Sequence, residues 1–143
     1  AEPVITVDAA RRWLRSRDEE WQTGSGYNWA ITEPGGMVVG NVAITAVNRR
    51  HDTGWMSYWT TERARGRGVA SAGVRAVATW AFDEVGLFRL ELGHRTNNPA
   101  SCLVAARAGF LVEGLERAKL RYDDQRFDVE LHARLATDPF STP

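Results

Sequence analysis

The sequence predicts an α/β protein with a mixed, mostly antiparallel central sheet built around a βαβ unit. Short runs of alternating apolar and polar residues fill much of the first half, and turn signals separate them, which is typical of antiparallel strands. Between residues 69 and 85 the apolar spacing changes to a helical period. A further strand follows this helix directly. A helix that connects two strands of one sheet requires those strands to run parallel, or nearly so.

The 143 residues have the size of one domain, and we expect residues 1–143 to form it. No apolar run approaches the roughly 20 residues of a membrane helix, and no signal peptide is visible. The single cysteine, Cys102, excludes an internal disulfide and indicates a cytoplasmic protein. Eighteen basic and eighteen acidic residues cancel, which argues against a nucleic-acid binder.

The first half contains one helix and three strands. Asp8 is a suitable N-cap for a helix from about Ala9 to Gln22, where apolar residues recur at helical spacing. Alternation then predicts a strand over Tyr27–Glu33, and Pro34-Gly35-Gly36 marks a turn. Two further strands are expected over residues 37–47 and 54–60, so the three strands form an antiparallel meander.

The second half alternates helices and strands. Gly86 is well placed as a left-handed residue after the helix over residues 69–85. Asn98-Pro99 combines an N-cap with proline at the first helical position. The predicted elements after the first of these helices are a strand, a helix and two closing strands, over residues 88–94, 99–109, 110–118 and 126–135.

An arginine- and glycine-rich loop, Arg65-Gly66-Arg67-Gly68, joins a strand to the helix that begins at Val69. The first amides of a helix lack internal partners and carry partial positive charge, and glycine lets a phosphate approach them. The loop is therefore suited to a phosphorylated ligand, although a solvated turn is the alternative. Neither the Gly-Lys-Ser/Thr of a P-loop nor the Gly-x-Gly-x-x-Gly of a Rossmann unit is present.

The segment Arg65-Gly66-Arg67-Gly68-Val69-Ala70 resembles the acetyl-CoA loop of the GNAT acyltransferases, Gln/Arg-x-x-Gly-x-Gly/Ala. Further pieces are similar to the family in the same order: Tyr58-Trp59, Trp80-Ala81-Phe82, Arg89-Leu90-Glu91-Leu92, Asn98-Pro99-Ala100-Ser101 and Ala108-Gly109-Phe110. The similarity extends from about residue 29 to residue 135 and looks closest to the bacterial ribosomal-protein N-terminal acetyltransferases.

The resemblance implies acetyl-CoA as co-substrate and no metal ion. In the family the fourth strand splays from the fifth, and the pantetheine arm pairs with the exposed strand edge. The implied backbone contacts to that arm are Trp59, Thr60 and Thr61, with a further contact from Asn98. The side chains of Arg65 and Arg67 would face the phosphates, and the loop from Arg65, with the amides from about Arg67 to Ser71, would hold the pyrophosphate. The implied cofactor residues are therefore Trp59, Thr60, Thr61, Arg65, Gly66, Arg67, Gly68, Val69, Ala70, Ser71, Asn98 and Ser101.

Two features depart from the family pattern. Many members place a tyrosine general acid four residues before the Gly-Phe pair, where this chain has Ala105, so the predicted acid is Ser101. A first-turn helix residue that bonds to the backbone is the alternative role for Ser101. The chain also begins at what resembles the second helix of the fold, and the family's first strand and helix are not evident.

The predicted catalytic residues are Ser101 and His94. His94 ends a strand near the expected cleft and has a reference pKa near 6.5, which suits a general base, while a surface or packing histidine is the alternative. Glu62 and Glu91 could act as bases through water, or be solvated charges. Cys102 could form an acyl-enzyme, although free cysteines are usually small buried hydrophobes.

These features together predict an N-acetyltransferase that transfers an acetyl or other short acyl group directly from acyl-CoA to a primary amine. The acceptor is a protein N-terminus or a small molecule. The alternative is a catalytically inactive CoA-binding regulatory module, which the alanine at position 105 would explain. We expect no nucleic-acid or membrane partner, and the chain could form a homodimer.

Overall fold

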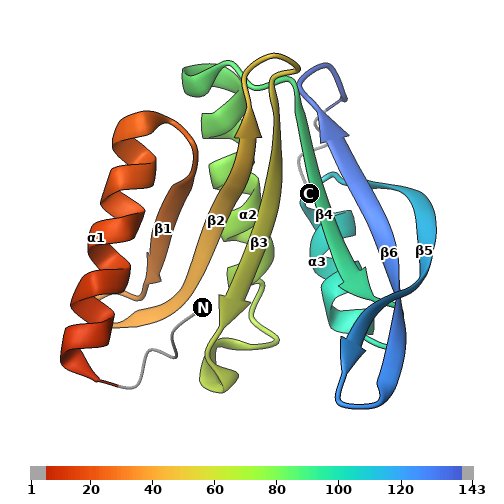
Figure 1. Ribbon diagram of the computed structural model, residues 1–143, viewed down its shortest axis with the longest axis horizontal. Coiled ribbons are helices and arrows are strands. Elements are labelled where there is room, and N and C mark those ends of the chain that lie inside the picture. The colour runs from red at the N-terminus through yellow and green to blue at the C-terminus, as the bar shows by residue number, and fades with distance from the viewer. Residues whose placement is uncertain (1–5, 140–143) are drawn as a thin grey trace.

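A computed structural model of the chain describes residues 6–139, so residues 1–5 and 140–143 of the predicted domain lie outside the described part. Six strands form one sheet in the order β1-β2-β3-β4-β6-β5 (Figure 1). All neighbouring strands are antiparallel except β3 and β4, which run parallel, and this confirms the predicted mixed sheet. The strands are β1 Tyr27–Thr32, β2 Val38–Asn48, β3 Thr53–Thr60, β4 Arg89–Arg95, β5 Leu111–Tyr122 and β6 Gln125–Leu135.

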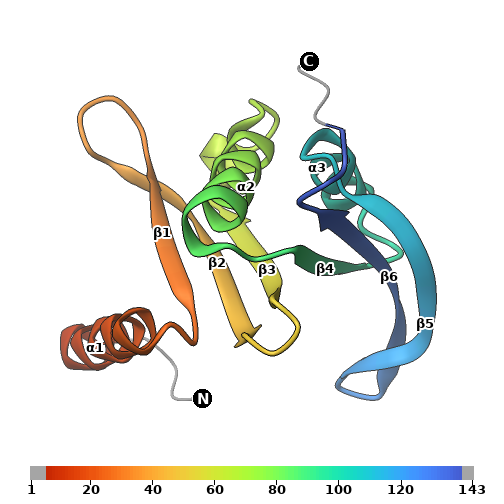
Figure 2. The same cartoon turned by 90° about the horizontal axis from the view of Figure 1, so that it is seen from above.

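The helices are α1 Val7–Thr23, the short 3₁₀ helix η1 Glu62–Ala64, α2 Val69–Trp80, the π-helical turn η2 Ala81–Val85 and α3 Pro99–Arg107. Figure 2 shows α2 and α3 together on one face of the sheet, while α1 lies beside β1 at the sheet edge. The helix predicted over residues 69–85 is therefore α-helical in its first part and widens into a π turn in its second. Gly86 ends it in the left-handed conformation, as predicted.

The N-cap of α1 is Thr6, and the prediction of Asp8 for this role is wrong. The Thr6 hydroxyl accepts a hydrogen bond from the Ala9 amide at 3.1 Å, the contact that an N-cap side chain makes with the third helical residue. Asp8 lies inside the first turn, where its negative charge faces the positive end of the helix dipole.

The strand β5 continues four residues beyond the predicted end at Ala118. A bulge between Glu116 and Leu120 breaks the alternation that the sequence analysis relied on. Ala118 has a positive φ of 52° there, and its amide donates to the Asp128 carboxylate at 2.7 Å. The bulge bends the β5–β6 hairpin and allows pairing to resume at Leu120.

The core lies between the sheet and the helices α2 and α3. Its fully buried members include Ile44 and Met56 from the sheet, Val74 from α2 and Ala105 from α3. A cluster of four aromatic rings fixes α1 and β1 to α2, with ring centroids 5.0–5.5 Å apart: Trp21, Tyr27, Trp29 and Trp80. Half of the tryptophans of the chain thus serve to hold α1 and β1 against α2.

The parallel strands β3 and β4 pair only over a short stretch. The register joins Thr53, Gly54 and Trp55 of β3 to Arg89, Leu90 and Glu91 of β4, and no pairing follows. Both strands continue beyond this point, β3 to Thr60 and β4 to Arg95 (Figure 1). The facing edges of the two strands therefore separate towards their carboxyl ends, and we call this region the split.

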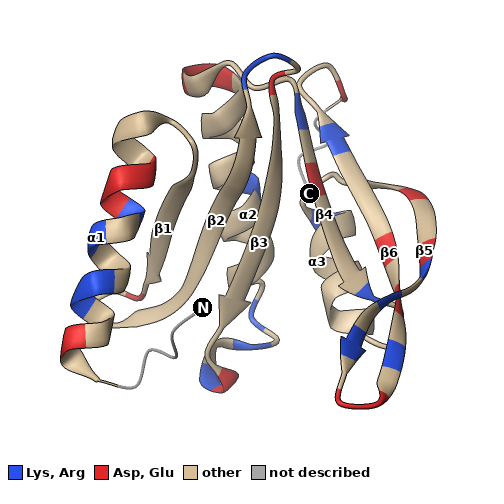
Figure 3. Cartoon of the chain, in the orientation of Figure 1, with Lys and Arg blue, Asp and Glu red and all other residues tan. Residues whose placement is uncertain are grey.

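Within residues 6–139, no helix is long and apolar enough to cross a membrane. Figure 3 shows basic and acidic residues interspersed over most elements, including along α1. The loop between β3 and α2 carries several of the basic positions.

Candidate active site

The loop before α2 leaves the first amides of that helix open. Gly68 is the N-cap and, like Gly66, has a left-handed backbone, with φ values of 74° and 75°. No side chain caps this helix end, and its first turn contains no acidic residue. The Ser71 hydroxyl donates to the Gly68 carbonyl at 3.1 Å and so does not cover the amides either. The helix dipole and the amides of the first turn thus have the features that favour an anion at this position.

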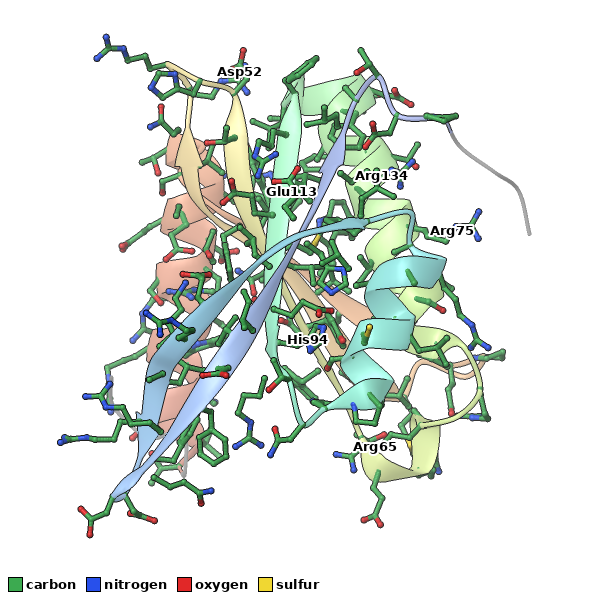
Figure 4. The ribbon with its side chains drawn as sticks, turned by 90° about the vertical axis from the view of Figure 1, so that its right-hand side faces the viewer. Asp52, Arg65, Arg75, His94, Glu113 and Arg134 are labelled. Carbon is green, nitrogen blue, oxygen red and sulfur yellow. The ribbon has the colours of Figure 1, made fainter. Side chains whose placement is uncertain are left out.

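A cavity of about 450 Å³ lies between this loop, the end of β3 and the start of α3. All the residues predicted to bind the cofactor line it, except Thr61 and Arg67. Figure 4 shows Arg65 in the loop, beside the start of α3. The cavity therefore brings together the glycine-rich loop and Asn98-Pro99-Ala100-Ser101, which are about 30 residues apart in the sequence.

The pairing of β3 with β2 decides which backbone groups face the split. The Thr61 amide donates to the Val39 carbonyl of β2 at 2.8 Å, and the Thr61 carbonyl accepts from Ala64 at 3.0 Å. Successive residues of an antiparallel strand turn their backbone N–H and C=O groups to opposite sides. The backbone groups of Trp59, two residues before Thr61, therefore also face β2. Tyr58 and Thr60 consequently direct their backbone groups into the split. Of the three predicted backbone contacts, only Thr60 points that way.

Arg63 and Arg67 are both held by Glu33 of the β1–β2 turn. The Arg63 guanidinium lies 2.6 Å from one carboxylate oxygen, and Arg67 binds the other. The hydrogen bond from Arg67 is the largest cause that holds the pKa of Glu33 below its ordinary value, and Arg63 adds to it. Of the two loop arginines expected to face phosphates, Arg67 is therefore turned to Glu33 and does not line the cavity, whereas Arg65 lines it and has no such partner among the described residues.

A second cavity of about 280 Å³ opens beyond the split and extends to the β5–β6 hairpin. It shares Tyr58, Asn98 and Ser101 with the first cavity. These three residues therefore stand at the junction of the two cavities. Such an arrangement allows one ligand to enter from the α2 loop and another from the hairpin, with their reacting ends meeting at the junction.

Tyr58 is the residue of this junction whose role the sequence analysis missed. Its hydroxyl is buried and has no hydrogen bond of good geometry among the described residues. Burial raises the pKa of Tyr58 above its ordinary value of 10.0, and the nearby Ser101 side chain offsets part of the rise. A phenol in this environment keeps its proton at neutral pH and can donate it. The alternation of β3 places Tyr58 on the face of buried Met56, and that pattern was the available signal.

Asn98 caps α3 as predicted, because its side-chain oxygen accepts from the Ser101 amide at 3.2 Å. This bond fixes Ser101 in the first turn, with its side chain at the junction. Ala105, which takes the position of the family's tyrosine, is fully buried in the core. The hydroxyl groups at the junction are thus those of Ser101 and Tyr58.

His94 lines the second cavity, but both of its ring nitrogens have partners. Nδ1 contacts the carbonyl of Arg95 at 2.8 Å, and Nε2 contacts Nε2 of His132 at 2.9 Å. Figure 4 shows His94 between the strands and α3. A histidine in this position must break one of these contacts before it can take a proton from an acceptor.

The other residues considered for catalysis lie outside both cavities. Glu91 is paired with Arg89 at 2.8 Å, and Glu62 is exposed in η1. Burial is the first cause that raises the pKa of the Cys102 thiol, and the charge of Glu130 adds to it. A thiol that keeps its proton is a poor nucleophile, so this arrangement disfavours an acyl-enzyme on Cys102.

Comparison with known proteins agrees with this geometry. Residues 2–111 match the family model described as "Acetyltransferase (GNAT) domain". The chain is 27% identical over 140 residues to the "Probable N-acetyltransferase YjcK" of Bacillus subtilis, an alignment that covers 96% of this chain and 77% of that protein. It is 29% identical over 98 residues to the ribosomal-protein-serine acetyltransferase of Escherichia coli, covering 68% of this chain and only 55% of that protein.

Among solved structures, the ribosomal-protein-S5-alanine acetyltransferase from Vibrio fischeri has the same fold. The TM-score is 0.86 at 19% sequence identity, over 96% of this chain and 79% of that one. The match of the family model, the split between β3 and β4 and the open helix end beside it lead to one conclusion. The chain belongs to the GNAT acetyltransferase family.

Proposed function

We propose that the protein transfers an acetyl group from acetyl-CoA directly to a primary amine at the junction of the two cavities. The observation that carries the proposal is the split, since it joins a phosphate-binding loop to a second cavity through Tyr58, Asn98 and Ser101. In this proposal the diphosphate lies on the first turn of α2, near Arg65. The pantetheine arm pairs with the backbone groups that Tyr58 and Thr60 turn into the split.

The reaction requires a polarised thioester carbonyl and a proton for the departing sulfur. We propose that a free backbone amide of β3 donates to the carbonyl oxygen, as in an oxyanion hole. The amine nitrogen forms a bond to the carbonyl carbon, and the carbon–sulfur bond then breaks. Tyr58 and Ser101 are the proposed donors to the sulfur. Because both ring nitrogens of His94 are engaged, water in the second cavity takes the amine proton in this proposal.

The second cavity favours an acceptor that is not a polycation. Among the described residues that line it, the charged side chains are Arg95, Lys119 and, when protonated, His94. The Lys119 ammonium lies over the Trp55 ring at 5.6 Å and pairs with the Glu116 carboxylate at 2.6 Å, which offsets part of its charge, whereas Arg95 has no carboxylate partner among the described residues. An unpaired like charge about 6 Å away repels by roughly 3 kcal/mol at an effective dielectric of 20, and the pairing of Lys119 with Glu116 lowers its share of this repulsion. A second ammonium group on the acceptor is therefore disfavoured, and we propose a protein N-terminus as the acceptor.

The proposal is tested by measuring thiol release from acetyl-CoA with peptides, spermidine and small amines as acceptors. We expect turnover with peptides that have a free N-terminus and none with the same peptides after N-acetylation. Spermidine should be the poorer acceptor, and Lys119→Glu should reduce that difference. Tight binding of CoA without turnover on any amine would instead support an inactive regulatory module.

The variant Ser101→Ala tests the junction itself. We expect kcat to fall and the dissociation constant of acetyl-CoA to stay nearly unchanged, because the hydrogen bond strengthens only as negative charge develops on sulfur. If the dissociation constant rises while kcat holds, Ser101 is a binding residue. Single-domain organisation and a homodimer remain predictions, which analytical ultracentrifugation of the purified chain would test.

A further inference from the structure

Four side chains with metal-binding atoms meet behind the junction. They come from three elements: His94 from β4, Glu130 and His132 from β6, and Cys102 from α3. The β4–β6 register sets His94 directly opposite Glu130, and His132 lies two residues further along the same face of β6. One ligand atom from each of the four lies within 4.8 Å of all the others. We call this group the four-residue cluster.

The separations between these atoms suit tetrahedral coordination. The Nε2 atoms of His94 and His132 are 2.9 Å apart, and the Glu130 carboxylate oxygen lies 3.0 Å from the second and 3.5 Å from the first. The same oxygen lies 3.7 Å from the Cys102 sulfur. Ligands at the bond lengths of tetrahedral Zn²⁺ are separated by roughly 3.3–3.8 Å. Small outward shifts of the two histidine rings would therefore accommodate the ion.

The orientation of His94 directs a lone pair into the cluster. Its Nδ1 is 2.8 Å from the Arg95 carbonyl, which can only accept, so Nδ1 carries the proton and Nε2 of the neutral ring is the acceptor. This is the arrangement found when a histidine binds a metal through one nitrogen and donates from the other to a carbonyl. The His132 Nδ1 has no partner, so nothing among the described residues fixes the tautomer of that ring.

The hydrogen bonds of the cluster rest on weak or shared donors, since among the described residues the donor to Glu130 besides His132 is the Cys102 thiol, at 3.7 Å. His132 Nε2 can offer one proton, and it faces both the His94 nitrogen and the Glu130 oxygen. Among the described residues, Glu130 has no lysine or arginine partner. The histidine side chains are only 6% and 1% exposed, so water does little to compensate. Several electron-rich atoms thus converge on a nearly buried point that a cation would satisfy.

We propose that His94, Cys102, Glu130 and His132 bind one Zn²⁺ ion. Nitrogen, sulfur and carboxylate ligands together suit zinc better than magnesium or calcium, which prefer oxygen alone. With four protein ligands the ion has no open position, so it acts structurally and takes no part in acyl transfer. It ties α3 to β4 and β6 and thereby steadies Ser101, the neighbour of Cys102 at the junction.

The test uses the purified full chain after treatment with a chelator, followed by titration with Zn²⁺ or Co²⁺. We expect one ion per chain with a dissociation constant below about 1 µM, and a melting temperature raised by roughly 8 °C at a hundredfold excess over that constant. Co²⁺ should give the intense visible bands of a tetrahedral site and a near-ultraviolet thiolate charge-transfer band. Cys102→Ser should abolish the charge-transfer band, and His132→Asn should weaken binding at least a hundredfold.

The third histidine provides the matched control. His51 is exposed in the β2–β3 turn, outside the cluster, so His51→Asn should bind Zn²⁺ like the wild type. Absence of stoichiometric binding to the folded chain at 10 µM would overturn the proposal. Co²⁺ spectra and affinity that are the same in Cys102→Ser as in the wild type would also overturn it. Because Cys102→Ser is nearly isosteric, the test stays valid even if His132→Asn fails to fold. None of these readouts depends on acetyltransferase activity.

Discussion

Replacing Tyr58 by phenylalanine should make the protein more stable and slow acetyl transfer at the same time. The substitution removes only the hydroxyl, which is buried and lacks a hydrogen bond of good geometry. Such a group costs about 1–3 kcal/mol of folding free energy. The nearby Ser101 side chain compensates part of the cost of burying this hydroxyl. We therefore expect the substitution to raise the free energy of unfolding by only about 1 kcal/mol. For a chain of this size that gain raises the melting temperature by roughly 3–4 °C.

The same hydroxyl is a proposed proton donor to the departing sulfur. General-acid contributions run at roughly 10²- to 10⁴-fold, and a thiolate is already a fair leaving group, with a thiol pKa of about 8.5. We therefore expect kcat of Tyr58→Phe to fall by about a hundredfold, with little change in the dissociation constant of acetyl-CoA. Steady-state kinetics and urea unfolding of the same preparations measure the two effects together.

The pH dependence of stability gives an independent readout. The folded-state pKa of Tyr58 is raised, so the folded protein holds this proton more tightly than the unfolded chain. The stability that comes from this tighter proton binding is fully present below the ordinary pKa of 10.0. It is lost as the pH rises from there towards the folded-state pKa of Tyr58. Tyr58→Phe should lack this alkaline loss, whereas the control Tyr27→Phe, in the aromatic cluster, should keep it. Wild-type kcat or reduced stability in Tyr58→Phe would refute the reasoning.

Three further predictions concern the cofactor loop and the sheet. Gly68→Ala and Gly36→Ala both place a side chain at positive φ, which costs about 1–2 kcal/mol of backbone strain in each variant. Only Gly68→Ala should weaken CoA binding more than tenfold when the affinity is measured by calorimetry. Equal weakening in both variants would contradict the assignment of the loop. Arg65→Gln should weaken CoA binding about tenfold more than Arg67→Gln, because Glu33 holds the Arg67 guanidinium outside the cavity. The reverse order would show that the ion pair between Arg67 and Glu33 opens when CoA binds. Gly54→Ala puts a Cβ 2.7 Å from a buried methyl of β2, so urea unfolding should show a loss of about 1–3 kcal/mol; unchanged stability would mean that the sheet relaxes there.

Features with local signals could be predicted from the sequence. The strands and helices follow from the period of apolar residues, and the Asn98 cap follows from an N-cap residue before proline. The cap of α1 was misplaced because Thr6 and Asp8 are both good N-cap residues, and their spacing of two residues does not separate them. The bulge at Ala118 could not be foreseen, since the Asp128 side chain that supports it lies on the next strand.

Features that depend on pairing between distant segments could not be predicted. Which backbone groups of β3 face the split is decided by the bond from Thr61 to Val39 of β2, which leaves Thr60 and Tyr58 on the open side. Tyr58 carries no motif that marks it as catalytic, and its position becomes meaningful only beside Ser101. The four-residue cluster likewise combines three elements whose spacing in the sequence matches no regular metal motif.

The split also has a consequence for how the chain avoids aggregation. Unpaired strand edges are templates on which other chains can add strands, and proteins usually block them with charges, bulges or prolines. Here the unpaired edges of β3 and β4 lie inside one sheet, and each faces the other strand across the split. A slender chain that carries amide groups, such as the pantetheine arm proposed above, could pair with these inner edges, whereas the outer rim of the sheet, where foreign strands usually add, is formed by β1 and β5. The protein therefore keeps strand edges available for pairing inside its sheet and not at the rim.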